Sequence, residues 1–319
     1  MPRRGEGSEF GLIARYLAPL AGSGSFGLTD DVGELAGLAV TKDLIVCGTH
    51  YLPGDPLDLV ACKAVRANVS DLVAKGCRPA AMLLGCVWPE GAGEDAFAAF
   101  ARGLGQDLQT YGLSLLGGDT TSALDLAGPT VSVTMIGVPS GRLVRRSGAR
   151  PGDRLYLFGT LGDGWLGLRA LTGQGAGDVA AANAYRLPDP PLAAAALIAR
   201  HASASLDVSD GLLADADHLA SASGVACAIK AEALPLSASG EAHLRAGGVL
   251  ADLATGGDDY QPLVAVGPSR EGAFCEAAAA AGLAVTAIGR CEAGRGVRLL
   301  ARDGTDLTPA RLGYAHLSG

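Results

Sequence analysis

The stretch PSGRLVRRSGARPGD, residues 139–153, decides how the chain is organised. It is polar, basic and rich in turn-forming residues, and largely apolar segments lie on both sides of it. This composition is typical of a boundary between domains, and a length of 319 residues suits two domains better than one. The sequence therefore predicts two domains, residues 1–141 and 142–319, each mixing helices and strands in an α/β fold.

Toward the N-terminus from this boundary, apolar runs of strand length alternate with helical patterns. The expected strands are runs within 36–48, 80–88, 113–117 and 130–138. Two of the expected helices are 8–20, with Ser8 as its N-cap, and 93–111. A third has Asp55 as its N-cap and Pro56 at its first position, and it ends near Gly76.

Toward the C-terminus, a strand at 154–159 and a helix directly after it follow the boundary. Further expected helices are 189–201, 212–223 and 270–281, and further strands are 225–230, 261–266 and 283–289. Both halves of the chain therefore have the mixed pattern.

The formal net charge of -8 argues against a surface for nucleic acid or for an anionic membrane, which would need a basic face. A carboxylate-rich site can still bind phosphates through metal ions. The seven cysteines form no C-x-x-C pair, which favours a reducing compartment. No run approaches the roughly 20 apolar residues of a membrane span, and the first residues do not resemble a signal peptide. We therefore expect a cytoplasmic protein.

One glycine pattern resembles a phosphate-binding motif but lies in the wrong structural context for one. Gly22, Gly24 and Gly27 fit G-x-G-x-x-G, with Lys42 further on, but a helix precedes them and no helix pattern follows. Protein-kinase motifs and the P-loop pattern G-x-x-x-x-G-K-[ST] are absent from the sequence. A flexible loop is the favoured interpretation of these glycines.

Aspartates in short motifs at the ends of apolar runs are the more informative signal. The motifs are Thr29-Asp30-Asp31, Thr41-Lys42-Asp43, Asn68-Val69-Ser70-Asp71, Gly117-Gly118-Asp119-Thr120-Thr121 and Asp207-Val208-Ser209-Asp210-Gly211. Mg²⁺ prefers hard oxygen ligands, commonly one or two carboxylates beside substrate phosphates. Phosphoryl transfer needs such ions and fixed geometry more than covalent chemistry from the protein. Each motif alone could equally be a turn or a helix cap.

Asp71 is the strongest of these candidates. It interrupts an apolar helical segment, on the same face as Asn68, and burying it without a cation would be costly. Gly117 and Gly118 suggest backbone N–H groups open to an anion.

Three further features keep two interpretations each. His50 could contact an anionic substrate or be structural. Arg145 and Arg146 could bind phosphate or form a solvated linker. Asp258, in Gly256-Gly257-Asp258-Asp259-Tyr260, could belong to a site or only to a tight turn.

Taken in order, the motifs resemble the thiamine-monophosphate kinases, in the superfamily of aminoimidazole ribonucleotide synthetase and selenophosphate synthetase. The resemblance covers nearly the whole chain. Besides the acidic motifs it includes Ser8-Glu9-Phe10-Gly11-Leu12-Ile13, Gly48-Thr49-His50-Tyr51-Leu52-Pro53, Arg146-Ser147-Gly148-Ala149-Arg150-Pro151-Gly152-Asp153 and Gly256-Gly257-Asp258-Asp259-Tyr260. Single motifs recur in the superfamily, but the ordered set with the His50 motif is specific to the kinases.

The resemblance implies a two-domain fold of the α/β (α+β) type like that of aminoimidazole ribonucleotide synthetase, with a homodimer formed through the N-terminal sheet. It implies Mg²⁺-assisted transfer of a phosphoryl group from ATP to thiamine monophosphate, without an acid or base residue. The implied metal ligands are Asp30, Asp31, Thr41, Asp43, Asp71, Asp119, Asp207 and Asp210. The implied ATP contacts are Gly118, Asp119, Arg146 and Ser209, and the implied substrate contacts are His50, Asp258 and Leu317.

Four residues depart from the family pattern: Thr29 replaces a Gly, Lys42 a metal-ligating Thr, Asp258 a Glu, and Leu317 an aromatic residue. An ammonium group cannot ligate a metal, so Lys42 leaves the number of Mg²⁺ ions open. The shorter Asp258 and the loss of a stacking ring at Leu317 leave the substrate affinity open. The alternatives are another ATP-dependent synthetase of the superfamily, or a weakly active paralogue that binds nucleotide or thiamine phosphate.

Overall fold

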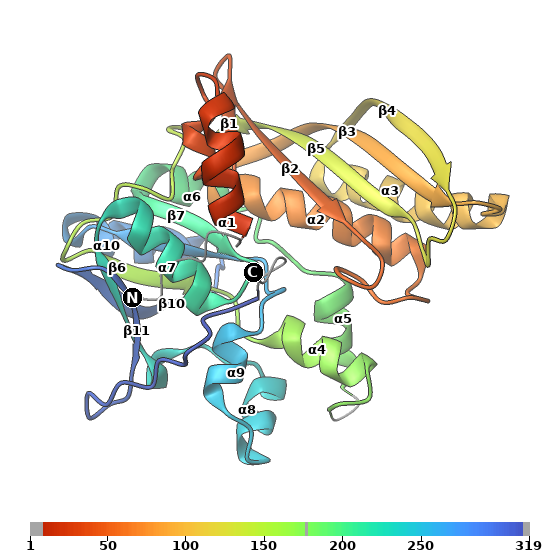
Figure 1. The fold of residues 1–319 in the computed structure, drawn as a ribbon. Coiled ribbons are helices and arrows are strands. Elements are labelled where there is room, and N and C mark those ends of the chain that lie inside the picture. Colours follow the sequence, from red (N-terminus) through yellow and green to blue (C-terminus); the bar gives the residue numbers. More distant parts are fainter. Residues whose placement is uncertain (1–8, 176–177, 315–319) are drawn as a thin grey trace.

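The computed structural model describes residues 9–175 and 178–314, and it contains two β-sheets. One sheet is built from strands between Gly33 and Pro139, and the other from strands between Arg154 and Leu300. Figure 1 shows the first sheet at the upper right and the second at the left, with the helix α2 (Leu57–Ala74) between them. The predicted two-domain α/β fold is confirmed, while the boundary between residues 141 and 142 stays a prediction.

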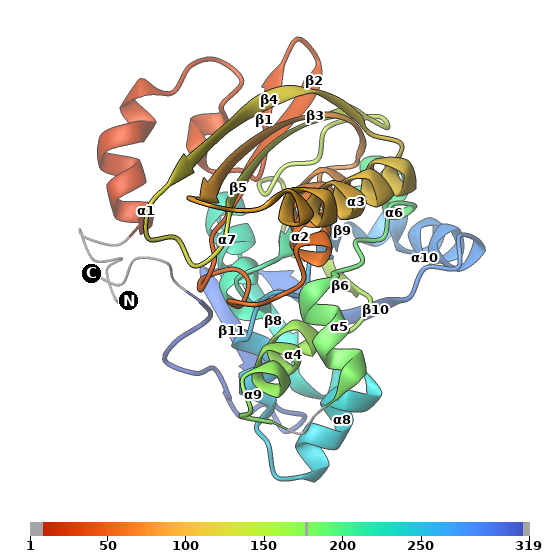
Figure 2. The same cartoon turned by 90° about the vertical axis from the view of Figure 1, so that its right-hand side faces the viewer.

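The N-terminal sheet has five strands in the order β1-β2-β5-β3-β4. Their bounds are β1 (Gly33–Leu35), β2 (Leu38–Ile45), β5 (Thr130–Pro139), β3 (Cys77–Pro89) and β4 (Ser114–Ala123). Figure 2 shows α2 and α3 (Glu94–Tyr111) beneath this sheet. Strand residues alternate between the two faces: in β2, Thr41 is buried on the helix side, whereas Lys42 is exposed on the other side, which we call the outer face.

The structure corrects two boundary predictions in this half. Asp55 does not cap α2; its carboxylate instead accepts the N–H of Leu52 at 2.8 Å and pairs with Arg186, and the helix begins at Leu57. The predicted stop at Gly76 is confirmed, because this residue has the left-handed φ of 73° that favours glycine.

The second correction concerns the Gly117-Gly118-Asp119 motif. Strand β4 does not end before the motif but continues through it to Ala123. A Cβ on Gly118 would lie 1.8 Å from the backbone oxygen of Leu84, so the close approach of β3 and β4 requires glycine at this position. The motif is therefore part of an edge strand and not a loop.

The C-terminal sheet has six strands in the order β11-β8-β10-β6-β9-β7. Their bounds are β6 (Arg154–Phe158), β7 (Ala202–Val208), β8 (Ala226–Lys230), β9 (Gln261–Val266), β10 (Val285–Glu292) and β11 (Gly296–Leu300). The sequence analysis missed β7 and β11. Strand β7 reads ASASLDV, and its small polar residues hide the apolar pattern of a buried strand.

The helices of this half are α4 (Asp163–Leu171), α5 (Val179–Arg186), α6 (Ala194–His201), α7 (Leu212–Ser223), α8 (Ala238–Arg245), α9 (Leu250–Thr255) and α10 (Glu271–Ala280). The sequence predicted α4, α6, α7 and α10 but not α5, α8 and α9. Before β1, the expected helix 8–20 consists of α1 (Glu9–Leu12) followed by a π turn (Ile13–Leu17) and a 3₁₀ turn (Ala18–Leu20).

Helix α2 holds the two halves together. Most of its side chains are buried, because it packs against the N-terminal sheet on one side and against β7 and β9 on the other. Ser70 in α2 donates a hydrogen bond of 2.7 Å to Asp207 in β7. In the part of the chain that the structure describes, no helix is both long and apolar enough to cross a bilayer.

Candidate active site

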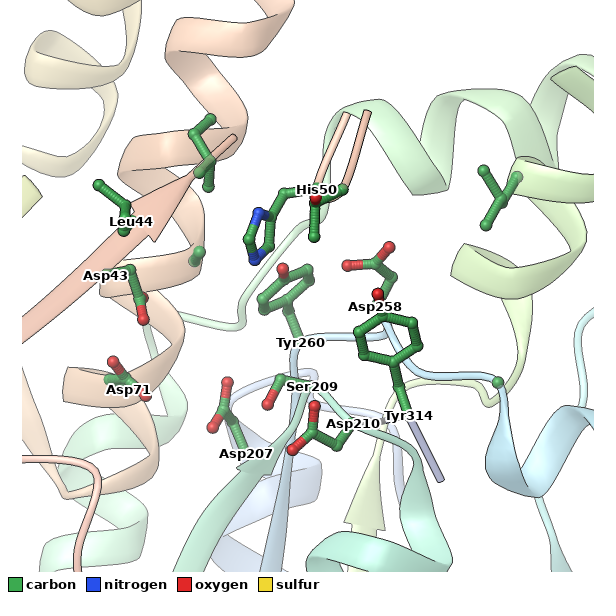
Figure 3. Close-up of a pocket in the computed structure, with 15 residues that line it drawn as sticks. Asp43, Leu44, His50, Asp71, Asp207, Ser209, Asp210, Asp258, Tyr260 and Tyr314 are labelled. Atoms are coloured by element: carbon green, nitrogen blue, oxygen red, sulfur yellow. The ribbon is translucent and has the colours of Figure 1, made fainter. Parts of the chain in front are cut away.

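A pocket lies between the two halves, where the C-terminal end of β7 approaches β2 and α2. Figure 3 shows Asp43 and Asp71 on one side facing Asp207 on the other, with His50 and Asp258 further along the same pocket. The two sides come from sequence segments more than 130 residues apart. The pocket therefore gathers motifs that the sequence shows only as separate fragments.

Carboxylates crowd one end of this pocket, which we call the carboxylate end (Asp31, Asp43, Asp71 and Asp207). Oxygen atoms of Asp31, Asp71 and Asp207 all lie within 4.8 Å of one another. Thr41 donates a hydrogen bond to Asp71 at 2.5 Å, and Asn68 accepts the backbone N–H of Asp43 at 3.2 Å. These bonds hold the carboxylates in place, and hard oxygen atoms at this spacing suit a magnesium ion.

The electrostatics of the carboxylate end agree with such an ion. Burial, followed by the charge of Asp31, raises the pKa of Asp43 to about 6 and that of Asp207 to about 7. Burial, followed by Asp43 and Asp207, raises the pKa of Asp71 well above its usual value. Buried carboxylates are this hard to ionise when no cation offsets their charge. The residues therefore fit a divalent metal, which would replace the protons.

Asp30 and Asp31 already have cationic partners in the chain. Lys75 at the end of α2 is fully buried, and its Nζ lies 2.9 Å from Asp30 and also contacts Asp31. Arg146 donates from Nε to Asp31 at 2.6 Å, and its backbone N–H donates to Asp30 at 3.1 Å. Although burial opposes ionisation, Arg146 and Lys75 keep the pKa of Asp31 below its usual value.

Ser209 and Asp210 follow directly after β7 and also line the pocket. The carboxylate of Asp215 in α7 accepts the backbone N–H groups of both residues, each at 3.1 Å. Oxygen atoms of Asp210 and Asp215 and a ring nitrogen of His218 lie within 4.8 Å of one another. Asp215, which the sequence analysis did not single out, thus fixes the loop that presents Ser209 and Asp210.

The other end of the pocket, which we call the histidine end, contains His50, Asp258 and Tyr314. Nδ1 of His50 accepts the backbone N–H of Val46 at 3.1 Å. The neutral ring therefore carries its proton on Nε2, so it can donate a hydrogen bond. The structure brings the predicted residues His50 and Asp258 to the same pocket.

Lys63 in α2 lies directly behind the histidine end and was not predicted. Its side chain is buried, with Nζ 2.8 Å from the backbone oxygen of His50 and 3.4 Å from Asp258. Nζ also lies 3.6 Å from the ring centroid of Tyr185. Burial lowers the pKa of Lys63, while Asp258 partly opposes this. Lys63 thus joins the His50 loop to the Asp258 loop through one ammonium group.

The Asp258 loop is under backbone strain. Asp258 and Tyr260 have φ values of 63° and 51°, which non-glycine residues rarely adopt. The backbone N–H of Asp258 donates to the backbone oxygen of Ser209 at 2.8 Å, and that of Tyr260 donates to the backbone oxygen of Val208 at 2.7 Å. Between them, Asp259 points away to accept the N–H of Gly162 at 2.9 Å, and burial raises its pKa to about 8. The strained loop thus places Asp258 and Tyr260 in the lining of the pocket.

An aromatic ring does line the histidine end. Tyr314 and Asp258 both line the pocket (Figure 3), and the backbone N–H of Tyr314 donates to the backbone oxygen of Asp210 at 2.9 Å. The position at which the sequence analysis expected the loss of a ring, Leu317, lies outside the described residues. The pocket thus has an aromatic residue three positions earlier in the sequence.

Gly118 and Asp119 do not reach this pocket within one chain. Along the sheet register, Asp43, Val133, Leu84 and Gly118 occupy one row over four neighbouring strands. Three strand spacings separate Asp43 from Gly118, which amounts to about 14 Å. Asp119 is exposed on the outer face, the opposite face to the carboxylate end.

Lys42 likewise lies on the outer face. Its Nζ contacts the hydroxyl of Ser132 in β5, whereas the neighbouring Thr41 points to Asp71. The ammonium group is thus not among the carboxylates, although its place in the sequence suggested that it was. Alternation along β2 accounts for the difference.

The chain matches two families over most of its length. Residues 28–139 match "AIR synthase related protein, N-terminal domain", and residues 150–302 match "AIR synthase related protein, C-terminal domain". The chain is 43% identical to a thiamine-monophosphate kinase of Caulobacter vibrioides, over 97% of this chain and 91% of the relative. The chain belongs to the thiamine-monophosphate kinase family.

Further comparisons agree with membership of the thiamine-monophosphate kinase family. The enzyme of Salmonella typhimurium is 35% identical over 97% of this chain and 98% of its own length. The solved structure described as "AaThiL complexed with AMPPCP and TMP" superimposes with a TM-score of 0.84 at 31% identity, over 99% of each chain. Escherichia coli HypE, at 20% identity and a TM-score of 0.71 over 87% of each chain, shares the fold.

Proposed function

We propose that this chain transfers the γ-phosphoryl group of ATP to the phosphate of thiamine monophosphate, giving thiamine diphosphate and ADP. The observation that carries the proposal is one pocket with two chemically different ends, one of carboxylates and one of His50, Asp258 and Tyr314. A related protein of the same fold is described with an ATP analogue and TMP together.

The carboxylate end would hold Mg²⁺ through Asp31, Asp71 and Asp207, with Asp43 beside them. When bound, the ions neutralise phosphate oxygens and polarise the transferred group. Thr41 supports this set by its hydrogen bond to Asp71, and Asp210 extends it toward α7. Asp30 forms ion pairs with Lys75 and Arg145, so we propose that its role is to position these two side chains.

The histidine end would hold the acceptor. His50 can donate from Nε2 to an oxygen of the substrate phosphate, and the buried ammonium of Lys63 adds positive charge behind it. The carboxylate of Asp258 can offset the positive charge of the thiazolium ring. Tyr314 offers a face on which an aromatic ring can stack.

Ser209 would contact ATP from within the pocket, and Arg146 from its place beside Asp31. An oxygen of the acceptor phosphate forms a bond to the γ-phosphorus as the bond to the β,γ-bridging oxygen breaks, and the electron pair leaves with ADP. The acceptor phosphate is already ionised, so no protein base has to remove a proton. The residues of this chain act by binding and orienting both phosphates.

We infer a homodimer formed through the outer face of the N-terminal sheet. This face carries Leu44 of β2, which is 50% exposed, and Leu83 of β3, which is 43% exposed, on two strands that β5 separates. A second copy there would cover these leucines and bring Gly118 and Asp119 of the partner copy into an interface next to β2. Leu83→Lys should then give a monomer in analytical ultracentrifugation, whereas a wild-type dimer fraction in that variant would contradict the inferred interface.

A cytoplasmic location and the absence of a nucleic-acid partner stay proposals that rest on the net charge of -8 and on the cysteines, all of which are free among the described residues.

Substrate comparison tests the proposed reaction. The full chain is incubated with ATP and Mg²⁺ and with either thiamine monophosphate, thiamine or pyridoxal phosphate, and the products are separated by chromatography. Thiamine diphosphate should form from thiamine monophosphate only. Failure to form it, or faster phosphorylation of another acceptor, would favour a different synthetase of the superfamily.

A further inference from the structure

A second polar cavity lies at the opposite end of strands β7 and β9 from the catalytic pocket. It has a volume of about 610 Å³, and its charged lining residues are Arg142, Arg145, Arg150, Asp153, His201 and Arg270. We call it the arginine cavity. Ala202 pairs with Val266 at this end of the strands, and Asp207 pairs with Pro262 at the other end. Five residues of a strand separate the two ends by about 17 Å, so the arginine cavity is a separate site.

Three of the four guanidinium groups that line this cavity have no carboxylate partner among the described residues, and the fourth, that of Arg145, lies 3.5 Å from Asp30. Among the described residues, no ion pair involves Arg142, Arg150 or Arg270. Arg142 donates to the backbone oxygen of Ala202, and Arg270 donates to that of Arg200 at 3.3 Å. Burial, followed by the charge of Arg270, lowers the pKa of Arg142. These positive charges therefore face one another with only neutral acceptors.

The one carboxylate of the lining does not offset them. Asp153 is buried, and its Oδ2 accepts the hydroxyl of Ser203 at 2.5 Å and the backbone N–H of Arg150 at 3.0 Å. These bonds hold the carboxylate in the turn before β6. A chain with a net charge of -8 thus concentrates unpaired cations in one cavity.

Unpaired like charges repel one another, and an anion with several oxygen atoms relieves this repulsion. Arginine forms paired hydrogen bonds to phosphate oxygens, and several arginines around one cavity suit a group with two phosphates better than a single phosphate. The volume of 610 Å³ leaves room for an attached organic group.

We propose that the arginine cavity binds the diphosphate group of a small molecule. The proposal does not depend on the reaction at the other end of the strands. The two sites nevertheless come close at one point, because Arg145, which lines the arginine cavity, lies 3.5 Å from Asp30, the neighbour of Asp31 in the sequence.

Calorimetry on the full chain tests this proposal. Because the catalytic pocket needs metal to hold phosphates, the titrations are done in EDTA, with inorganic diphosphate, ADP and thiamine diphosphate as separate ligands. We expect binding that the double variant Arg142→Gln/Arg270→Gln weakens at least about tenfold, since it removes two charge-assisted donors. The control variant Arg298→Gln loses one arginine charge on β11, outside the cavity. It should bind the three ligands as the wild type does.

The three ligands distinguish the source of the diphosphate. Equal affinities would show that only the diphosphate is recognised, and a preference for ADP or thiamine diphosphate would show that the attached group is recognised as well. Absence of binding by the wild type to all three, or equal binding by the double variant, would overturn the proposal.

A second measurement uses the wild-type chain and does not depend on how the variant folds. Phenylglyoxal modifies accessible arginines, and mass spectrometry locates the modified residues. Diphosphate should protect Arg142 and Arg270 but not Arg298. Equal modification of all three with and without diphosphate would contradict the proposed site.

Discussion

The two ends of the catalytic pocket achieve their charge in different ways. At the carboxylate end, Asp43, Asp71 and Asp207 lie close together and raise one another's pKa, so this end needs a cation from outside the chain. At the histidine end, the cation is Lys63, which the chain itself buries. Under the proposed function, metal removal should therefore disable the carboxylate end only, because the chain itself supplies the cation of the histidine end.

The largest effect should come from the carboxylate end. Asp71→Asn removes one charge from the centre of the cluster while keeping the side-chain size. We expect turnover to fall at least about 100-fold. Even changes to residues that only support metal ligands lower metal affinity or activity about 10- to 100-fold. Initial rates with ATP and thiamine monophosphate measure this. Asp95→Asn, on the exposed start of α3, is the control. Near wild-type turnover in Asp71→Asn would mean that this residue is only structural.

The next effect should come from Lys63 behind the histidine end. Lys63→Met keeps the apolar stem but removes the ammonium that joins His50 to Asp258. A hydrogen bond to a charged group contributes about 1.5–3 kcal/mol, so KM for thiamine monophosphate should rise roughly 10- to 100-fold, with KM for ATP little changed. Lys230→Met, at the exposed end of β8, serves as the control. A change confined to KM for ATP would remove Lys63 from the acceptor end.

A smaller effect is expected at Tyr314. Tyr314→Leu removes the ring of the histidine end, and aromatic contacts contribute about 0.5–1.5 kcal/mol beyond the buried area. The KM for thiamine monophosphate should therefore rise about 2- to 10-fold, and Tyr314→Phe should retain the wild-type value. Equal KM values in all three proteins would show that the ring does not contact the substrate.

The smallest effect should be a pH-dependent gain in stability with Mg²⁺. The pKa values of Asp43 and Asp207 are raised to about 6 and about 7, so the metal-free folded state holds protons that the unfolded state releases near pH 4. These groups therefore lower the stability of the metal-free protein as the pH rises from about 4 to about 7. Mg²⁺ competes with the same protons.

Thermal unfolding with and without Mg²⁺ checks this expectation. The rise in Tm with Mg²⁺ should be larger at pH 8 than at pH 5.5, by a few degrees or roughly 1 kcal/mol. Asp71→Asn should lose most of the difference. An equal rise in Tm at both pH values would show that the ion does not replace protons at Asp43 and Asp207.

The two ends also differ in how far the sequence predicts them. The carboxylates could be predicted, because metal chemistry restricts the residue types and Asp71 interrupts an apolar helix. Lys63 interrupts the same helix and Lys75 follows its last residue, but lysines at such positions are usually solvated, so only their burial reveals their roles.

Strand order was the other obstacle to prediction. Local sequence does not show that β4 pairs with β3 at the edge of the sheet, about 14 Å from Asp43. Gly118 and Asp119 therefore looked like neighbours of the other motifs. Side chains alternate between the two faces along β2, and this alternation places Lys42 on the outer face. Its position can be predicted once the register of the strand is known.

The most direct test of the central claim is ³¹P nuclear magnetic resonance of the reaction. The full chain is mixed with ATP, thiamine monophosphate and Mg²⁺, with Asp71→Asn examined in parallel. The account predicts that the monophosphate signal is replaced by the two signals of thiamine diphosphate as ADP forms in equal amount, only with Mg²⁺ and only in the wild type. Release of inorganic phosphate without thiamine diphosphate, or equal conversion by Asp71→Asn, would contradict it.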